Sequence, residues 1–411
     1  MVYWKHHFLG TYIFSFFVFF VLALPTNANV LLGVENVLDN HLGLIQGKKL
    51  GIVANHTSIT SKKQPIIDVL AQHARIVALF GPEHGFTGKT AAGGSVKDKV
   101  RAGMKIFSLY GDYRTPTPNM LKDVEMLVYD IQDVGVKFYT YISTLYLSLH
   151  AASREGIPIL VLDRPNPIGG TRVDGPVTNP VYCSFVGPMP LPIRYGMTVG
   201  ELASMMNKEP LLGFAPRADL TVVEMKHYKR TMTYAETGLP WVATSPNMPS
   251  VETALLYPGI CLLEGTNLSE GRGTHTPFLT VGAPYIDAKK WLAALPKNVK
   301  NGVQITAVTF TPRQIKGKAE HPKYKNQKCH GLQFHVTDAK KLKPLALGVA
   351  LLSSAQKLYP NTFTMRSFID RLWGNEDLRA MIEEGKPAKH ILETTKDDVF
   401  HFRKIRESYL R

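Results

Sequence analysis

Carboxylate side chains stand directly after short apolar runs of the sequence. Glu83 follows the run 76–80 within the segment GPEHG, and Asp130 and Asp133 follow the run 126–129. Hydrolysis of a glycosidic bond usually needs two carboxyl groups, one protonated to assist the leaving oxygen and one ionised to activate water or attack carbon. These positions therefore favour carboxylate chemistry on a sugar.

Glu83 is the best candidate for the acid. Gly81 and Gly85 leave room beside it for the close approach of a ligand. The neighbouring Phe80 and Phe86 are expected to exclude water, which favours the neutral form of a carboxyl group.

Two further sets of acids are candidates for the second carboxyl group. Asp130 and Asp133, three residues apart, are expected to face one pocket, where two like charges do not both ionise readily. Glu264 begins the segment EGTNLSEGRGT (264–274), which lies opposite the first set if the chain folds back. A purely structural turn is the alternative interpretation of this segment.

Polar side chains suited to a sugar ligand accompany these acids. Amide and hydroxyl groups recognise sugar hydroxyl and N-acetyl groups, and an arginine can hold a carboxylate through two parallel hydrogen bonds. The predicted binding residues are Asn55, His56, His84, Tyr139, Arg164, Asn166, Asn267, Glu270 and Arg272.

Other familiar chemistries lack their motifs. The segment FTGKT (86–90) resembles the end of a phosphate-binding loop, but Glu83 occupies the position of the loop's first glycine. The sequence has no G-x-G-x-x-G after a predicted strand, no G-x-S-x-G and no H-E-x-x-H. We therefore expect neither a nucleotide cofactor nor a metal.

The elements that position these residues alternate between strands and helices. Strands buried on both faces are apolar at successive positions, and strands that alternate with helices form a doubly wound, mostly parallel sheet. In such a sheet, ligands bind at the carboxyl ends of the strands. The predicted strands are 50–54, 76–80, 106–109, 126–129 and 157–162, with helices over 62–73 and 140–155.

The remainder of the chain predicts a second, smaller domain. Residues 171–195 are rich in Pro and Gly and predict a long crossing loop, after which Thr198 and Glu201 form a capping box at a helix start. The later predicted elements are strands 222–225, 304–310 and 332–336 and a helix over 345–358. We expect a Rossmann-like α/β catalytic domain over 29–281, an α+β domain over 282–411, and the active site in the cleft between them.

Residues 1–28 predict a secretory signal peptide. Lys5 precedes an almost wholly apolar run, 8–24, and small or polar residues lead to a cleavage site after Ala28. An uncleaved membrane anchor is the alternative, because 17 apolar residues are close to the minimum for a span. Cleavage would remove any stable membrane anchor. The mature protein would then be a periplasmic or secreted bacterial protein.

The charge of the chain fits such a location. Lys and Arg number 48 against 33 Asp and Glu, a formal net charge of +15, which suits an anionic cell envelope. Nucleic acid is not an expected partner outside the cell. The three cysteines are too few for a disulfide scaffold. The segment 313–328 is a candidate wall-facing basic patch or a solvated loop.

The longest motifs resemble a known family. GIVANHTSIT, LFGPEHGFTG, VYDIQDVGVKFYTYISTL, VLDRPNPIGG, ATSPNMPS and LLEGTNLSEGRGT look like the exo-acting β-N-acetylmuramidases, long known as a domain of unknown function, over about residues 31–411. The resemblance implies release of N-acetylmuramic acid from non-reducing ends of peptidoglycan fragments, muropeptides or disaccharides, in cell-wall recycling. It implies a catalytic Glu83, and roles for Asp130, Asp133, Glu264 and Glu270.

Two other functions remain open at this stage. The chain could act on another amino sugar, such as a β-N-acetylglucosaminide, or bind muropeptides without catalysis. Retention, inversion and assistance by the substrate's N-acetyl group also remain open, because they depend on the separation of the two carboxyl groups.

Overall fold

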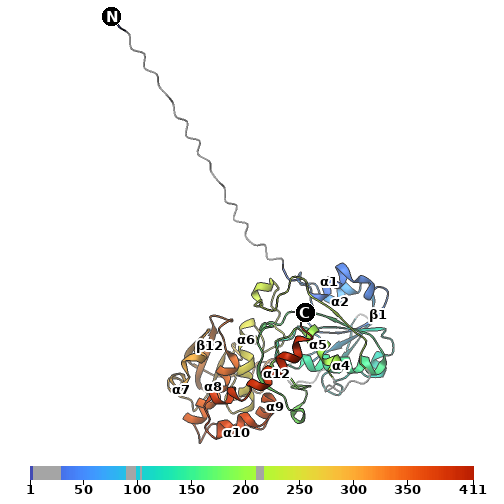
Figure 1. Cartoon of the computed structure of the whole chain (residues 1–411). Helices are drawn as coiled ribbons and strands as arrows, with labels where there is room; N and C mark the ends of the chain where they lie inside the picture. Colours follow the sequence, from blue (N-terminus) through green and yellow to red (C-terminus); the bar gives the residue numbers. More distant parts are fainter. Residues whose placement is uncertain (3–28, 89–98, 102–103, 210–216) are drawn as a thin grey trace.

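The computed structural model describes residues 1–2, 29–88, 99–101, 104–209 and 217–411. An N-terminal α/β half, coloured blue to green in Figure 1, lies beside a C-terminal half coloured yellow to red. The predicted signal peptide falls almost entirely outside the described residues. Within them, no helix is long and apolar enough to span a bilayer.

The N-terminal half contains the predicted parallel sheet. Its strand order is β3-β4-β2-β1-β5-β6-β9, and only β3 runs antiparallel to its neighbour. The predicted α/β fold class is confirmed. The strands are β1 (Lys49–Ala54), β2 (Arg75–Gly81), β3 (Lys99–Arg101), β4 (Met104–Ser108), β5 (Met126–Asp130), β6 (Ile159–Leu162) and β9 (Leu220–Val223).

Helices cover both faces of this sheet because neighbouring strand residues point to opposite sides. Leu50 and Ile52 join one apolar cluster with residues of α1 (Gly33–Asn40) and α2 (Ile66–Leu70). Val53 joins another with residues of α4 (Tyr141–Glu155), α5 (Val199–Lys208) and the C-terminal half. A short helix, α3 (Pro118–Leu121), precedes β5.

The helix predicted over 62–73 is shorter in the structure. It spans only Ile66–Leu70, because Pro65 lacks an N–H and restricts the residue before it. Lys63 adopts a φ of 63°, which is incompatible with an α-helix. The segment 171–195 also differs from the predicted loop, since β7 (Asp174–Val177) and β8 (Pro192–Arg194) pair there. Their Gly and Pro content hides the strand pattern.

The C-terminal half is built on an antiparallel sheet of order β10-β12-β11. The predicted boundary after residue 281 falls within β10, and the division into domains stays a prediction. The strands are β10 (Thr280–Ala283), β11 (Val303–Phe310) and β12 (Cys329–Val336). The helices are α6 (Val251–Ile260), α7 (Ala288–Ala294), α8 (Pro344–Leu358), α9 (Phe368–Trp373), α10 (Asp377–Glu383) and α11 (Ala388–Glu393).

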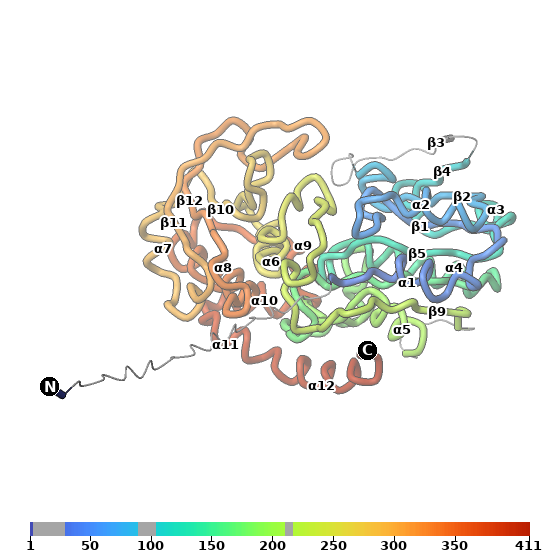
Figure 2. The backbone as a smooth tube through the Cα atoms, turned by 90° about the horizontal axis from the view of Figure 1, so that it is seen from above, coloured from blue at the N-terminus to red at the C-terminus, as the bar shows by residue number. Residues whose placement is uncertain are grey.

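The last helix, α12 (Lys396–Glu407), returns to the N-terminal half (Figure 2). Asp398 accepts a hydrogen bond from the backbone N–H of Val177 at 2.9 Å, and Arg406 donates to the carbonyl of Gly170 at 3.1 Å. One apolar cluster runs without interruption from the sheet into the C-terminal half. The two halves are therefore joined by a shared core as well as by this helix.

Candidate active site

Glu83 lies in a buried turn at the carboxyl end of β2. His84 and Gly85 have φ values of 69° and 72°, so the chain reverses sharply immediately after the glutamate. The Glu83 side chain is only 8% exposed, and its Oε2 accepts a hydrogen bond from the Thr140 hydroxyl at 2.6 Å. Thr140 directly precedes α4, which fixes the direction of the carboxyl group.

Tyr110, after β4, also contacts this carboxyl group. Burial, and then the charge and hydrogen bond of Glu83, raise the pKa of Tyr110 to about 12, while Arg114 opposes the shift. Arg114 is exposed, and its guanidinium lies 4.4 Å from the centre of the Phe185 ring. Arg114 is therefore a cation close to Tyr110 that the sequence analysis did not identify.

Asp133 is the second carboxyl group that the structure brings here. Its Oδ2 accepts hydrogen bonds from the Gly135 N–H at 2.6 Å and from the Tyr195 hydroxyl. Burial raises the pKa of Asp133 to about 6, against the opposing effect of these donors. Its buried Oδ1 has no hydrogen-bond partner among the described residues.

Tyr139 lies near enough to both carboxyl groups for their charges to affect its pKa. Its hydroxyl lies 2.7 Å from the Thr244 hydroxyl. Burial raises the pKa of Tyr139, the hydrogen bonds with Ser245 and Thr244 oppose the shift, and the charges of Asp133 and Glu83 add to it. Both carboxyl groups thus act electrostatically on one buried phenol. Such pairs in different environments are typical of acid–base sites.

Asp130 and Arg164 form a buried salt bridge. The guanidinium binds both carboxylate oxygens, one at 3.0 Å, and also donates to the Ile59 carbonyl at 2.8 Å. Burial raises the pKa of Asp130, and Arg164 opposes this shift. Both side chains are buried. Their predicted catalytic and carboxylate-binding roles stay predictions, but the pair has the geometry of an internal salt bridge.

The predicted binding residues after β1 keep unused polar atoms. Asn55 accepts hydrogen bonds from the N–H and hydroxyl of Thr57 at 2.9 and 2.6 Å, whereas its Nδ2 has no partner among the described residues. His56 Nε2 lies 2.6 Å from the Ala243 carbonyl, and its Nδ1 has no described partner. Burial lowers the pKa of His56, and the Ala243 contact opposes this.

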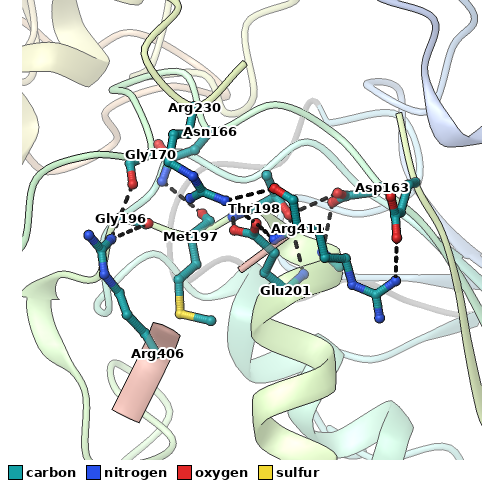
Figure 3. Close-up of polar contacts among 12 residues, drawn as sticks. Asp163, Asn166, Gly170, Gly196, Met197, Thr198, Glu201, Arg230, Arg406 and Arg411 are labelled. Atoms are coloured by element: carbon teal, nitrogen blue, oxygen red, sulfur yellow. Dashed lines mark hydrogen bonds and ion pairs between the residues drawn. The ribbon is translucent and has the colours of Figure 1, made fainter. Parts of the chain in front are cut away.

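Asn166 instead holds the loop after β6. Its amide donates to the Met197 carbonyl at 2.9 Å, shown in Figure 3, and its oxygen accepts from the Ile168 N–H at 3.1 Å. A side chain at Gly135 would collide with this amide, since an added Cβ would lie 2.2 Å from its oxygen. Asn166 therefore supports the turn that carries Asp133.

The segment 264–274 forms a network of its own. Arg272 binds Glu264 at 2.7 Å, and Lys323 binds Glu270 at 3.0 Å. Burial lowers the pKa of Arg272, but the two glutamates outweigh this and leave it raised. Asn267 accepts hydrogen bonds from the Tyr285 hydroxyl at 2.8 Å and the Thr364 N–H at 3.1 Å. These contacts match the structural interpretation of the segment.

An aromatic layer separates this network from Tyr139. Tyr257, on α6, lies edge-on to Tyr139 with 5.9 Å between ring centres and to Phe278 at 4.8 Å. Arg272 in turn lies 5.1 Å from the centre of the Phe278 ring. The segment thus folds back toward the N-terminal half through packed rings, and its predicted role in the site stays a prediction.

Several site residues escaped the sequence analysis. The position of Tyr110 directly after a predicted strand could have indicated a site residue. It was not among the candidates because the predicted catalytic residues are all acidic. Thr140, Tyr195 and Thr244 carried none, since hydroxyl residues far apart in sequence are common. Among the described residues, no group of three or more His, Cys, Asp or Glu is placed to hold a metal ion.

Comparisons with known proteins agree with the motifs. The family described as exo-beta-N-acetylmuramidase NamZ matches through its N-terminal model over residues 50–252 and its C-terminal model over 255–411. The chain is 41% identical over 384 residues to the peptidoglycan beta-N-acetylmuramidase NamZ of Bacillus subtilis, an alignment that covers 92% of this chain and 90% of that protein.

Two solved structures from Bacteroides fragilis, both DUF1343 family proteins, share the fold. One is 32% identical with a TM-score of 0.82 and covers 93% of this chain and 98% of its own. The other is 34% identical with a TM-score of 0.76 and covers 93% and 99%. The resemblance found in the motifs is confirmed. The chain belongs to the exo-β-N-acetylmuramidase NamZ family of glycoside hydrolases.

Proposed function

We propose that this chain releases N-acetylmuramic acid from the non-reducing ends of peptidoglycan fragments, with Glu83 and Asp133 as its two carboxyl groups. The observation that carries this assignment is the burial of both carboxyl groups at the carboxyl edge of the parallel sheet. Glu83 is hydrogen-bonded to Thr140, which adjoins Tyr139, and Asp133 acts on the same Tyr139. The activity named for the Bacillus subtilis relative supports the reaction and the substrate.

Glu83 exchanges the proton with the glycosidic oxygen. A hydroxyl group donates to a carboxylate and accepts from a carboxylic acid, so Thr140 holds Glu83 in either protonation state. The raised pKa keeps the Tyr110 phenol protonated and able to donate throughout. Together these contacts orient the carboxyl group before the substrate arrives, as efficient proton transfer requires.

Asp133 supplies the second carboxyl group. With a pKa of about 6, it is ionised in most molecules at neutral pH and accepts a proton readily. Its buried Oδ1 has no hydrogen-bond partner among the described residues, so one oxygen of the side chain stays uncommitted. Asp130 is unsuited to this role because Arg164 occupies both of its oxygens.

Replacement of Glu83 tests the assignment. Glu83→Gln keeps the shape of the side chain but removes the ionisable group, so we expect turnover of a chromogenic N-acetylmuraminide to fall about a hundredfold to ten-thousandfold. Substrate binding, measured by calorimetry, should persist. Glu125→Gln, an exposed acid paired with Lys49, is the matched control and should leave turnover unchanged. Near-normal turnover in Glu83→Gln would remove Glu83 from the mechanism.

We also propose that residues 1–28 direct export to the periplasm or the medium, where peptidoglycan fragments are present. The charged start, the apolar run 8–24 and the small residues before Asn29 support this. Mass spectrometry of the protein from the producing cell should find a chain that begins at Asn29. Full-length chain in the membrane fraction would contradict cleavage.

A further inference from the structure

A basic pocket of about 490 Å³ lies away from Glu83, where the two halves meet. The loop 167–172 and the segment 230–235 form one side of it, and the start of α6 and Lys340 form the other. Arg172, Arg194, Arg230 and Lys340 line this pocket, and none of its lining residues is acidic. A pocket of this size holds one sugar ring with its substituents.

Arg194 gives the pocket a buried cation with an unused donor. Its side chain is 6% exposed, donates to the Ile168 carbonyl and lies 3.7 Å from Asp174. Its Nε has no hydrogen-bond partner among the described residues. Because this Nε is closed to solvent, the guanidinium contributes to the pocket through its charge.

Arg230, which also lines the pocket, likewise has one nitrogen without a hydrogen-bond partner in the part of the chain that the structure describes. Its Nη2 binds Glu201 at 2.7 Å and the Arg411 carbonyl at 2.9 Å, as Figure 3 shows, whereas its Nη1 has no partner among the described residues. Two guanidinium groups thus line one pocket and attract an anionic ligand through their charge.

The other two cations leave an excess of positive charge. Arg172 donates to the backbone carbonyls of Leu342, at 2.5 Å, and of Lys340, which carry no formal charge. The Lys340 ammonium lies 3.1 Å from Glu236 at the rim. Three acids therefore accompany four cations, because Asp174 and Glu201 lie beside Arg194 and Arg230. Apolar Met232 and Leu255 supply surface for a sugar ring.

The pocket lies on the same edge of the sheet as Glu83. Its loop 167–172 follows β6, whereas Glu83 follows β2, and the strand order places three spacings between them. At about 4.8 Å per spacing, the ends of β2 and β6 are about 14 Å apart along this edge. The separation exceeds one sugar ring, so an occupant of both sites must be an oligosaccharide.

We infer that this pocket binds the lactyl carboxylate of a second N-acetylmuramic acid residue, on the leaving side of the scissile bond. Peptidoglycan alternates N-acetylmuramic acid with N-acetylglucosamine, so the first carboxylate beyond the cleaved bond lies on the third ring. The inference rests on the proposed function. It makes a trisaccharide a better substrate than the disaccharide that ends in N-acetylglucosamine.

A charge placed at the mouth of the pocket tests this. Thr231 lines the pocket and is exposed, so Thr231→Glu adds a negative charge and Thr231→Gln is its uncharged match. The ratio of kcat/KM for the trisaccharide to that for the disaccharide should fall about fivefold in Thr231→Glu, the effect of one partly screened charge. It should not change in Thr231→Gln. An unchanged ratio in Thr231→Glu would overturn the inference, as would an equal fall in both variants.

A binding measurement separates this inference from the proposed function. If the wild-type chain cleaves neither sugar, the proposed function fails. Calorimetry with the intact trisaccharide then tests whether the pocket binds a carboxylate. Binding weakened in Thr231→Glu but retained in Thr231→Gln supports the carboxylate site. Equal binding by the two variants excludes it.

Discussion

Two aspartates at the carboxyl end of β5 differ because their neighbours differ. Asp130 ends β5 and meets the guanidinium of Arg164, whereas Asp133, three residues later, meets only hydroxyl and N–H donors. Both are buried, and burial disfavours the charged form of each. Arg164 opposes the effect of burial on Asp130 and occupies both of its oxygens, which leaves Asp133 as the carboxyl group with an uncommitted oxygen.

Asp133→Asn should alter the pH dependence of stability. An acid whose pKa is raised from 3.8 to about 6 in the folded protein binds more protons folded than unfolded, so stability falls as the pH rises through this range. The variant lacks this fall, which amounts to at most about 3 kcal/mol. Urea unfolding at pH 4.5 and pH 7 should therefore show a smaller loss for Asp133→Asn than for the wild type. Equal losses would contradict the raised pKa.

At the scale of elements, the start of α5 combines a local motif with a distant residue. The Thr198 hydroxyl accepts the Glu201 N–H at 3.2 Å, and Glu201 accepts the Thr198 N–H at 2.9 Å. Asp163, at the end of β6, accepts the Thr198 hydroxyl at 2.8 Å and the Gly200 N–H at 2.7 Å. This cap fixes α5 against the edge of the sheet (Figure 3).

Thr198→Ala should destabilise the protein by about 1 kcal/mol, because it removes a capping hydroxyl. The free energy of unfolding in urea measures this loss. Thr198→Ser keeps the hydroxyl group and should restore most of the stability. A loss of equal size in both variants would mean that the threonine methyl group, and not the cap, is responsible.

At the scale of the whole molecule, Arg406 is one of the residues through which α12 joins the two halves. The buried Arg406 guanidinium donates to the carbonyls of Gly170 at 3.1 Å, Thr171 at 3.1 Å and Gly196. A network around Glu201 continues from there, where Arg230 and the Arg411 N–H both reach its Oε1 (Figure 3). Residues close to the C-terminus thus stabilise the turns that follow β6.

Arg406→Met should cost about 3 kcal/mol of unfolding free energy, because several buried carbonyls lose their donor. Arg403→Met, an exposed arginine on the same helix, is the matched control and should change stability by less than about 0.5 kcal/mol. Chemical unfolding of both variants measures the difference. Equal stability of the two would show that α12 contributes through its apolar face alone.

The sequence by itself determined the parallel sheet and the helix after Thr198, and it placed Glu83 and Asp133 among the candidate acids. Apolar runs, capping residues and strand ends are local patterns, so they can be recognised from the sequence without knowledge of the fold. Only the tertiary structure decided which charges meet. It engaged Arg164 with Asp130 and Arg272 with Glu264, left Arg194 with an unused donor, and brought Tyr110 and Thr140 to Glu83. Such partners lie in different loops, and no local pattern encodes their proximity.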